Sequence, residues 1–497
     1  MIQKGCGDVR RALCLLCCLL LLPSFFVFAA SGADEYAYPE PQVLQIDLVM
    51  HPYRYLKMIH SMDKQKYPAV VCIGEGDPLP IGVQVRGASS LREGLNSASK
   101  RIPMELCFDY VDPDGTFRGN PSLKLINCLT PARLITQLVA MQAFAFLDVP
   151  APRITPTFIR INDTDFGLYL AVEDLNEAFM QNNFGGGSLY RPISEKDDRD
   201  TRTICSFEWI DMVAKVDAGN ETIQRYTQAR DSGTDAEAFL DVDECLRYMA
   251  CETFVTNDDC FITNNHNFYV ADDHGKLKLV VWDQDTVFTA FSEGVGLESF
   301  ERLADKNNRC YQFLMQDEAN HARYLQYIRQ LNDAFLNPDT FLPWLENYIR
   351  VLSPFFQRDA TIAVQSEDVL ADLTTGNCLY NSLFGNLPLT FRMYHDQLGA
   401  QLRGESDGFT VPQDMTTQSA ELEAAEASGS KSGDHSIIFR VCAGYWRLRR
   451  QAMRQNDGAA LLMIGVLFAV VFAAAILSVY HPAVFRRKNH TSGGKQV

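Results

Sequence analysis

The feature that most constrains this chain is residues 257–285, where two groups of acidic and amide side chains flank a predicted β-hairpin. Two β-prone segments, 268–270 and 277–282, are separated by the turn-forming residues 272–275. Because a hairpin brings its two ends together, the loop that contains Asp259 should lie beside the acidic turn that ends the stretch. Any fold of this chain must therefore accommodate several carboxylates at one place.

The spacing of these polar residues indicates a class of chemistry. Asn264 follows Asp259 by five positions, and Asp283 and Asp285 follow the predicted hairpin. Protein kinases use this order: a catalytic-loop Asp accepts the substrate hydroxyl proton, and an Asn five positions on holds metal. A later Asp, after a short hairpin, holds the metal on the phosphates. Two solvated polar turns are the alternative, because Asp and Asn are also common turn residues.

Composition bounds the class of protein. With 497 residues, of which 47% are hydrophobic, the chain can bury one large or two modest cores. Its formal net charge of −17 argues against a nucleic-acid-binding protein, which needs a basic face. An acidic groove would instead attract basic protein substrates.

Both ends of the chain carry apolar segments. Residues 1–33 combine a basic start, an apolar run and small residues, which is the layout of a secretory signal peptide; an uncleaved signal anchor is the alternative. Residues 459–480 are apolar and uncharged over a length that crosses a bilayer, and they predict a transmembrane helix. We therefore expect a single-pass type I membrane protein of the cell surface or the secretory pathway, with its body luminal or extracellular.

Between these ends we expect one folded domain at 34–403, with its core at about 45–360. Residues 404–436 are rich in Ser, Thr, Glu and Ala and predict a disordered stalk. Residues 437–458 mix aromatic side chains with arginines, as an amphipathic segment beside a membrane does. Residues 481–497 would then form a cytoplasmic tail.

Nine cysteines lie in the body between the two apolar ends, with Cys442 near the membrane, and an exported body with this many is expected to contain disulfides. Cys251 and Cys260 flank the start of the acidic loop. A bridge there would make the loop rigid, and two buried thiols are the alternative. Sequons at Asn162 and Asn220 predict glycosylation of a luminal body.

Two predicted strands, 81–86 and 102–108, enclose the small residues 87–90, and Lys100 precedes the second strand. A small-residue turn beside a cation suits binding of a nucleotide phosphate. An ordinary hairpin with a basic edge is the alternative.

The rest of the body mixes strands and helices. A strand pair at 158–161 and 166–172 is closed by Glu173. Apolar residues at helical spacing predict a helix that begins at Thr130-Pro131, one at 239–256 that delivers the acidic loop, and a helical subdomain from 317 to about 363.

Together these segments resemble the CotH-like kinases, the spore-coat protein H family of atypical protein kinases. The matches keep the family order and are Arg86-Gly-Ala-Ser-Ser, Lys100-Arg101, Leu147-Asp-Val-Pro-Ala-Pro-Arg153, Gly167-Leu-Tyr-Leu-Ala-Val-Glu173, Ser188-Leu-Tyr-Arg191, Asn257-Asp-Asp259 with Asn264-Asn265, and Trp282-Asp-Gln-Asp285.

The resemblance implies an α+β, divergent protein-kinase-like fold with a C-terminal helical subdomain, here followed by the transmembrane helix. It also implies binding of ATP with Mg²⁺ or Mn²⁺ and phosphorylation of Ser or Thr in exported proteins. The expected partner is thus a protein substrate in the secretory pathway or at the surface, and no nucleic acid.

The resemblance also assigns roles by position. Asp259 matches the catalytic Asp, with Asn264 and Asn265 as the adjoining polar pair. The metal-binding turn matches Asp283 and Asp285. The candidates for nucleotide contacts are Arg86 and Lys100 for the phosphates, and Glu173 as the partner that orients the cation.

The chain departs from the family pattern at three positions, none of which is acidic. Ala88 stands where the family usually has Asn, Arg191 where it has Lys, and Thr289 where Gly is frequent. A catalytically inactive CotH-like surface adhesin is the alternative function. A Ca²⁺-binding module or a hydrolase that uses the same carboxylates is a further alternative, although the full EF-hand spacing is missing.

Overall fold

The computed structural model describes residues 36–410, apart from 62–63, 88, 97–100, 130, 193–211, 220, 258, 289–295 and 360–389. The chain divides into two compact units, Met1–Ala37 and Tyr38–Val497, and every strand and helix described below belongs to the second. The predicted signal peptide, membrane-proximal segment, transmembrane helix and tail lie outside the described residues, as does the predicted stalk except for its first residues, 404–410. Within the described part of the chain, no helix has the length and apolarity to cross a bilayer.

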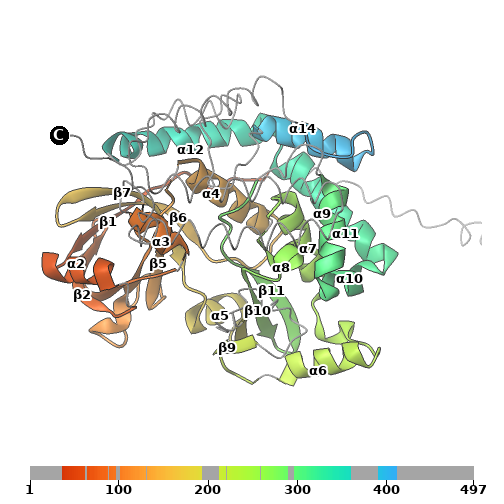
Figure 1. Cartoon of the computed structure of the whole chain (residues 1–497), viewed down its shortest axis with the longest axis horizontal. Helices are drawn as coiled ribbons and strands as arrows, with labels where there is room; N and C mark the ends of the chain where they lie inside the picture. Colours follow the sequence, from red (N-terminus) through yellow and green to blue (C-terminus); the bar gives the residue numbers. More distant parts are fainter. Residues whose placement is uncertain are drawn as a thin grey trace, which may run out of the picture. The chain divides into compact units, whose positions relative to one another are not determined.

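The N-terminal part of the body is a closed seven-stranded barrel (Figure 1). Neighbouring strands are antiparallel except β1 and β6, which pair in parallel and close the barrel with Leu44 opposite Thr157. Closure leaves no open sheet edge. The strands in order around the barrel are β1 (Leu44–Val49), β2 (Tyr67–Ile73), β3 (Leu79–Val85), β4 (Met104–Cys107), β5 (Ser122–Ile126), β7 (Thr164–Glu173) and β6 (Ile154–Ile161).

The barrel forms because its strands alternate apolar and polar residues. In β1, for example, Ile46 and Leu48 are buried, while Gln45 is exposed and Asp47 is half-buried. Successive side chains of a strand point to opposite faces, so the alternation fills the barrel interior. Around the strands lie α2 (Pro52–Ser61), α3 (Ser89–Asn96), the short helix η1 (Phe108–Tyr110) and α4 (Pro131–Phe146).

The strands predicted at 81–86 and 102–108 are confirmed as β3 and β4, and they pair directly with each other. The connection between them differs from the prediction, because α3 begins at Ser89 where a simple small-residue turn was expected. Leu91 of this helix is buried in the barrel core, which explains why the segment is helical.

A second sheet of four strands lies in the order β11-β10-β8-β9. The predicted hairpin is confirmed, with Asp273 paired to Lys276 beside its turn and Phe268 paired to Val281 at its open end. The four strands of this sheet are β8 (Ser188–Pro192), β9 (Met212–Val216), β10 (Phe268–Asp273) and β11 (Lys276–Val281). Helix α5 (Glu177–Phe184) precedes β8, and α6 (Glu221–Asp231) and η2 (Glu237–Phe239) follow β9.

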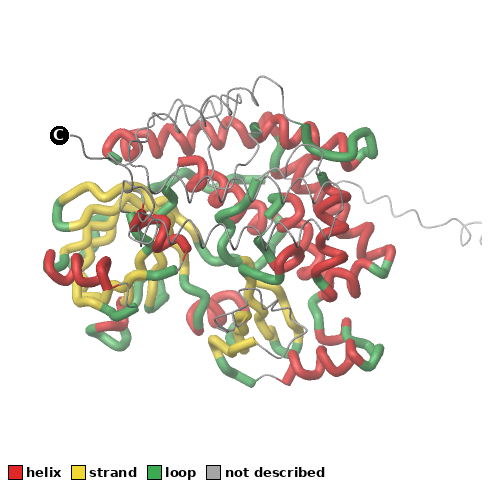
Figure 2. The backbone as a smooth tube through the Cα atoms, in the orientation of Figure 1, coloured by secondary structure: helices red, strands yellow, loops and turns green. Residues whose placement is uncertain are grey.

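The predicted helical region is also confirmed, so the body is α+β (Figure 2). Helix α7 (Val242–Phe254) is buried along most of its length, and Asp241 caps it by accepting a hydrogen bond from the Glu244 amide at 3.1 Å. The helices that follow α7 are α8 (Phe261–Asn264), α9 (Leu297–Asn307), α10 (Arg309–Met315), α11 (Glu318–Gln330), η3 (Leu331–Phe335), α12 (Pro338–Arg358) and α14 (Phe391–Leu402).

A buried ion pair joins the end of α12 to the barrel. Arg101 Nη1 lies 2.6 Å from Asp359 Oδ2, and both side chains are 0% exposed. The same Asp359 oxygen accepts a hydrogen bond from the Leu168 amide at 3.0 Å. The second guanidinium nitrogen of Arg101 donates to the carbonyl oxygens of Asn127 and Cys128.

Among the cysteines that the structure describes, six are free thiols: Cys72, Cys107, Cys128, Cys245, Cys251 and Cys260. The Cys251 thiol donates to the Ala143 carbonyl at 3.6 Å, and the Cys260 thiol donates to the Asn257 carbonyl at 3.2 Å. The thiol alternative at the start of the acidic loop thus describes this structure, and each thiol has its own backbone partner.

Candidate active site

The hairpin brings the two acidic segments into contact, as its geometry predicts. Asn257, which follows α7, is fully buried, and its amide nitrogen donates to Gln284 Oε1 at 3.2 Å. Its amide oxygen accepts from Thr286 Oγ1 at 2.9 Å and from the Asp259 backbone amide at 3.0 Å. One side chain thereby ties the loop of Asp259 to the turn at 283–286.

The two carboxylates of this turn, Asp283 and Asp285, have raised pKa values. Burial raises the pKa of Asp283, and the Asp259 carboxylate raises it further, while the Arg86 guanidinium opposes both. Burial and the charge of Asp283 raise the pKa of Asp285 to about 8. Carboxylates that raise one another's pKa need a cation between them to be ionised together. The arrangement therefore favours binding of a positive charge.

The backbone around this cluster is unusual. Asp283 has a φ of +55°, and the β-branched Thr256, just before the Asp259 loop, has a φ of +48°. Left-handed backbone is disfavoured for a residue with a side chain, most of all for a β-branched one. Strain of this kind is characteristic of functional sites, where surrounding contacts hold it in place.

Asp259 is held by two residues that sequence reasoning missed. Asn267 Nδ2 donates to Asp259 Oδ2 at 3.2 Å and to its carbonyl oxygen at 3.0 Å. His266 Nδ1 lies 3.3 Å from the same carboxylate oxygen, and this hydrogen bond raises the pKa of His266. The Asp259 side chain remains 36% exposed, so a substrate can reach it. These two residues could have been found from the sequence, because they belong to the polar run Asn264-Asn265-His266-Asn267.

The predicted amide pair lies next to this loop. Asn264 ends α8, and its side chain lies outside the described residues. Asn265 follows with a φ of +51° and a side chain that is 2% exposed. Its amide nitrogen donates to the Asn307 carbonyl at 2.8 Å, and its amide oxygen accepts from Asn308 Nδ2 at 2.9 Å. Asn265 therefore anchors the loop to the junction of α9 and α10.

The predicted phosphate contacts fall in different places. The Arg86 guanidinium lies 5.7 Å from the ring centre of Trp282, next to the acidic turn. Lys100 lies outside the described residues. Glu173 is buried and binds Arg153 through both carboxylate oxygens, at 2.8 and 3.1 Å. The structure thus pairs Glu173 with Arg153 and brings Arg86 to the site.

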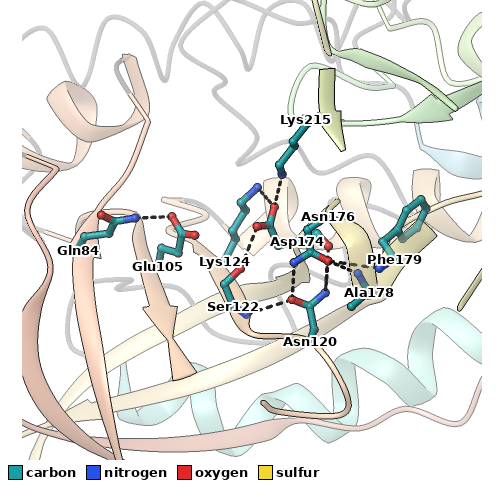
Figure 3. Close-up of polar contacts among 10 residues, drawn as sticks. All are labelled: Gln84, Glu105, Asn120, Ser122, Lys124, Asp174, Asn176, Ala178, Phe179 and Lys215. Atoms are coloured by element: carbon teal, nitrogen blue, oxygen red, sulfur yellow. Dashed lines mark hydrogen bonds and ion pairs between the residues drawn. The ribbon is translucent and has the colours of Figure 1, made fainter. Parts of the chain in front are cut away.

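A lysine that the sequence reasoning did not single out lies beside Arg86. Lys124 projects from β5, and its ammonium lies 4.4 Å from the ring centre of Trp282. It forms an ion pair with Asp174, the residue after β7 (Figure 3). Burial and the nearby Lys215 lower the pKa of Lys124 to about 8. Its only sequence signal is a lysine flanked by leucines in a short strand, Ser-Leu-Lys-Leu-Ile.

Asp174 is the centre of a polar network that joins the barrel to the second sheet. Its carboxylate binds Lys215 of β9 at 2.7 Å and accepts a hydrogen bond from Ser122 Oγ at 2.8 Å (Figure 3). Burial alone would raise its pKa, but the two lysine ammoniums lower it to about 2. The Asp174 carbonyl accepts from Asn120 Nδ2 at 3.0 Å. One carboxylate thus faces two cations, which leaves net positive charge beside Trp282.

The acidic turn fits a divalent cation that is completed by a ligand. Among the described residues, no three His, Cys, Asp or Glu side chains form a metal-binding group by themselves. Mg²⁺ in nucleotide sites uses one or two carboxylates together with phosphate oxygens. The half-buried pair of Asp283 and Asp285, with their raised pKa values, supplies this donor set. These two residues would hold the metal, and the cations beside Trp282 would face the phosphates.

Comparison with known proteins agrees with this geometry. The family described as CotH kinase protein matches residues 83–376, which is more than half of the chain and includes both acidic segments. The inner spore coat protein H of Bacillus subtilis (strain 168) is 21% identical over 192 residues, which cover 35% of this chain and 51% of the relative. The chain thus matches about half the length of that relative. It belongs to the CotH kinase family.

Proposed function

We propose that this protein is an ATP-dependent Ser/Thr protein kinase that transfers the γ-phosphoryl group of ATP to hydroxyl groups of exported proteins. The observation that carries the proposal is the contact between the Asp259 loop and the turn of Asp283 and Asp285, made through Asn257. Membership of the CotH kinase family supports a kinase that uses ATP.

The order of elements supports a divergent kinase-like fold. A buried strand lysine, Lys124, is followed by helix α4 and the strand pair β6 and β7. A loop with a catalytic Asp, a hairpin and an acidic turn come later, which is the order of a protein kinase. One feature differs: the strand lysine of protein kinases pairs with a helical Glu, whereas Lys124 pairs with Asp174 after β7.

The side chains divide the work of phosphoryl transfer, which depends on positioning and charge stabilisation. Asp259, held by His266 and Asn267, accepts a hydrogen bond from the substrate hydroxyl and then takes its proton. Arg86 and Lys124 bind phosphate oxygens and offset their negative charge. A bound Mg²⁺ or Mn²⁺ supplies further charge neutralisation at the phosphates.

The proposal extends to the substrate and the compartment. The substrate is a protein in the secretory pathway or at the cell surface, and the net charge of −17 favours basic ones. The predicted signal peptide and the apolar segment 459–480 support a type I membrane protein with its body luminal or extracellular. Nucleic acid is not a proposed partner.

The test is phosphate transfer by the full-length protein in detergent micelles, with labelled ATP, Mg²⁺ or Mn²⁺ and a Ser-rich basic protein. We expect Asp283→Ala and Asp259→Ala each to reduce transfer by about 10²–10³-fold, the usual effect of removing a group that stabilises or positions reacting atoms. Asp273→Ala is the matched control, since Asp273 lies at the far end of the same hairpin, where it pairs with Lys278 at 2.8 Å.

Three outcomes are informative. Transfer by the wild type and the control, lost in both site variants, would support the kinase function. Binding of ATP without transfer would instead support an inactive relative with a binding role. Neither transfer nor ATP binding would refute the proposal and favour the surface adhesin.

A further inference from the structure

The middle residue of the acidic turn points into the protein. Gln284 lies between the two turn carboxylates and is only 2% exposed. Its amide oxygen accepts a hydrogen bond from Asn257 at 3.2 Å, and its amide nitrogen donates to Glu252 Oε1 at 3.1 Å. Gln284 therefore anchors the turn to buried side chains of the protein interior.

One of these two partners, Glu252, has no role in the chemistry proposed above. Glu252 lies on the last turns of α7 and is 0% exposed. Its oxygen Oε1 holds Gln284, while Oε2 has no hydrogen-bond partner among the described residues. Burial raises the pKa of Glu252 to about 7, and the hydrogen bond from Gln284 acts in the opposite direction. A buried carboxyl group of this kind is costly to the fold.

We propose that Glu252 is a positioning residue for the acidic turn, acting through the Gln284 amide to set where Asp283 and Asp285 lie relative to the Asp259 loop. This inference rests on the proposed function, because it assigns a role in holding the metal and the phosphates. Outer residues that orient metal-binding side chains typically change metal affinity or activity by 10–100-fold when they are replaced.

The same helix provides a matched control. Glu244 lies eight positions earlier on α7 and is 1% exposed. Its Oε2 accepts from the Leu279 amide of β11 at 2.9 Å, and its Oε1 has no hydrogen-bond partner in the described part of the chain. Glu244 and Glu252 thus lie on the same helix and are both buried, but only Glu252 is bonded to Gln284 of the turn.

The experiment compares Glu252→Leu, Glu252→Gln and Glu244→Leu in the full-length protein. Leucine removes the acceptor for Gln284, whereas glutamine retains an oxygen at that place. Free Mn²⁺ is measured by electron paramagnetic resonance, with and without a non-hydrolysable ATP analogue, and thermal unfolding is recorded beside it. We expect Glu252→Leu to weaken Mn²⁺ binding by about 10–100-fold, with most of the affinity kept in Glu252→Gln and in Glu244→Leu.

If Glu252→Leu does not fold, Gln284→Met removes the same contact from the other side and should weaken Mn²⁺ binding to a similar extent. Wild-type affinity in Glu252→Leu or Gln284→Met would overturn the positioning role alone. An equal loss in Glu244→Leu would also overturn it, because the effect would then come from the helix as a whole. Absence of Mn²⁺ and nucleotide binding in the wild type would refute the proposed function together with this inference.

Discussion

The ion pair between Arg101 and Asp359 gives the sharpest test of what holds the helical region to the barrel. In Asp359→Ala, Arg101 keeps its bonds to two carbonyls but loses the Asp359 carboxylate, and the Leu168 amide loses its acceptor. Both ionic side chains are 0% exposed, so water cannot replace the carboxylate. Removing one partner of a buried pair costs about 3–5 kcal/mol, and the unsatisfied amide favours the upper end.

The assay is urea unfolding of the purified protein, with the free energy of unfolding compared between variants. Arg358→Ala is the control, because the neighbouring residue Arg358 binds Asp165 at 2.8 Å in a pair that is 40% and 35% exposed. An exposed pair contributes about 0–1 kcal/mol. The double variant Arg101→Met/Asp359→Leu should recover part of the loss, since it removes both charges together. Equal losses of 1 kcal/mol or less in Asp359→Ala and Arg358→Ala would refute the reasoning.

Three further predictions concern the site and its supports. Lys124→Met removes a charged hydrogen-bond donor worth about 1.5–3 kcal/mol, so the KM for ATP should rise about 10- to 100-fold in steady-state kinetics; an unchanged KM would exclude Lys124 from the phosphate site. His266→Ala removes a side-chain partner of the Asp259 carboxylate. The kcat should fall by about 2- to 10-fold with little change in the KM for ATP, and a change in KM alone would contradict the assignment. Burial raises the pKa of Glu244 to about 8, so its contribution to stability is fully present below pH 4.5 or so and is lost as the pH rises through about 8. Urea unfolding at pH 5 and pH 7.5 should therefore show a smaller loss of stability in Glu244→Gln than in the wild type, by up to about 1.4 kcal/mol per pH unit, and equal losses would contradict the burial argument.

The central hairpin could be predicted from sequence because its signals are local. Alternating β-prone residues and a turn cluster specify β10 and β11, and hairpin closure alone places the Asp259 loop beside Asp283. Several strands and helices were also readable, among them β3, β4, β6, β7 and α7, since each carries its own apolar periodicity. These features need no knowledge of distant contacts.

The cationic side of the site was not readable in the same way. The place of Lys124 is set by the pairing of β5 with β7, in which it lies opposite Val172, two residues before Asp174. Sequence reasoning chose Glu173, but successive residues of an extended strand point to opposite sides. Glu173 faces Arg153, and Asp174 faces the lysines. Long-range register decides between them, and a single sequence does not specify register.

The parallel pairing of β1 with β6 has a consequence for how the protein is made. The barrel cannot close until Thr157, the partner of Leu44, has been synthesised, and more than one hundred residues lie between the two in the chain. At a synthesis rate of about 5–20 residues per second, the two strands emerge roughly 5–20 s apart. During that interval β1 and its neighbours are an open sheet with unpaired edges, which can pair with other chains. The nascent barrel is therefore at its most aggregation-prone before β6 is synthesised, and chaperone binding in that window would protect it.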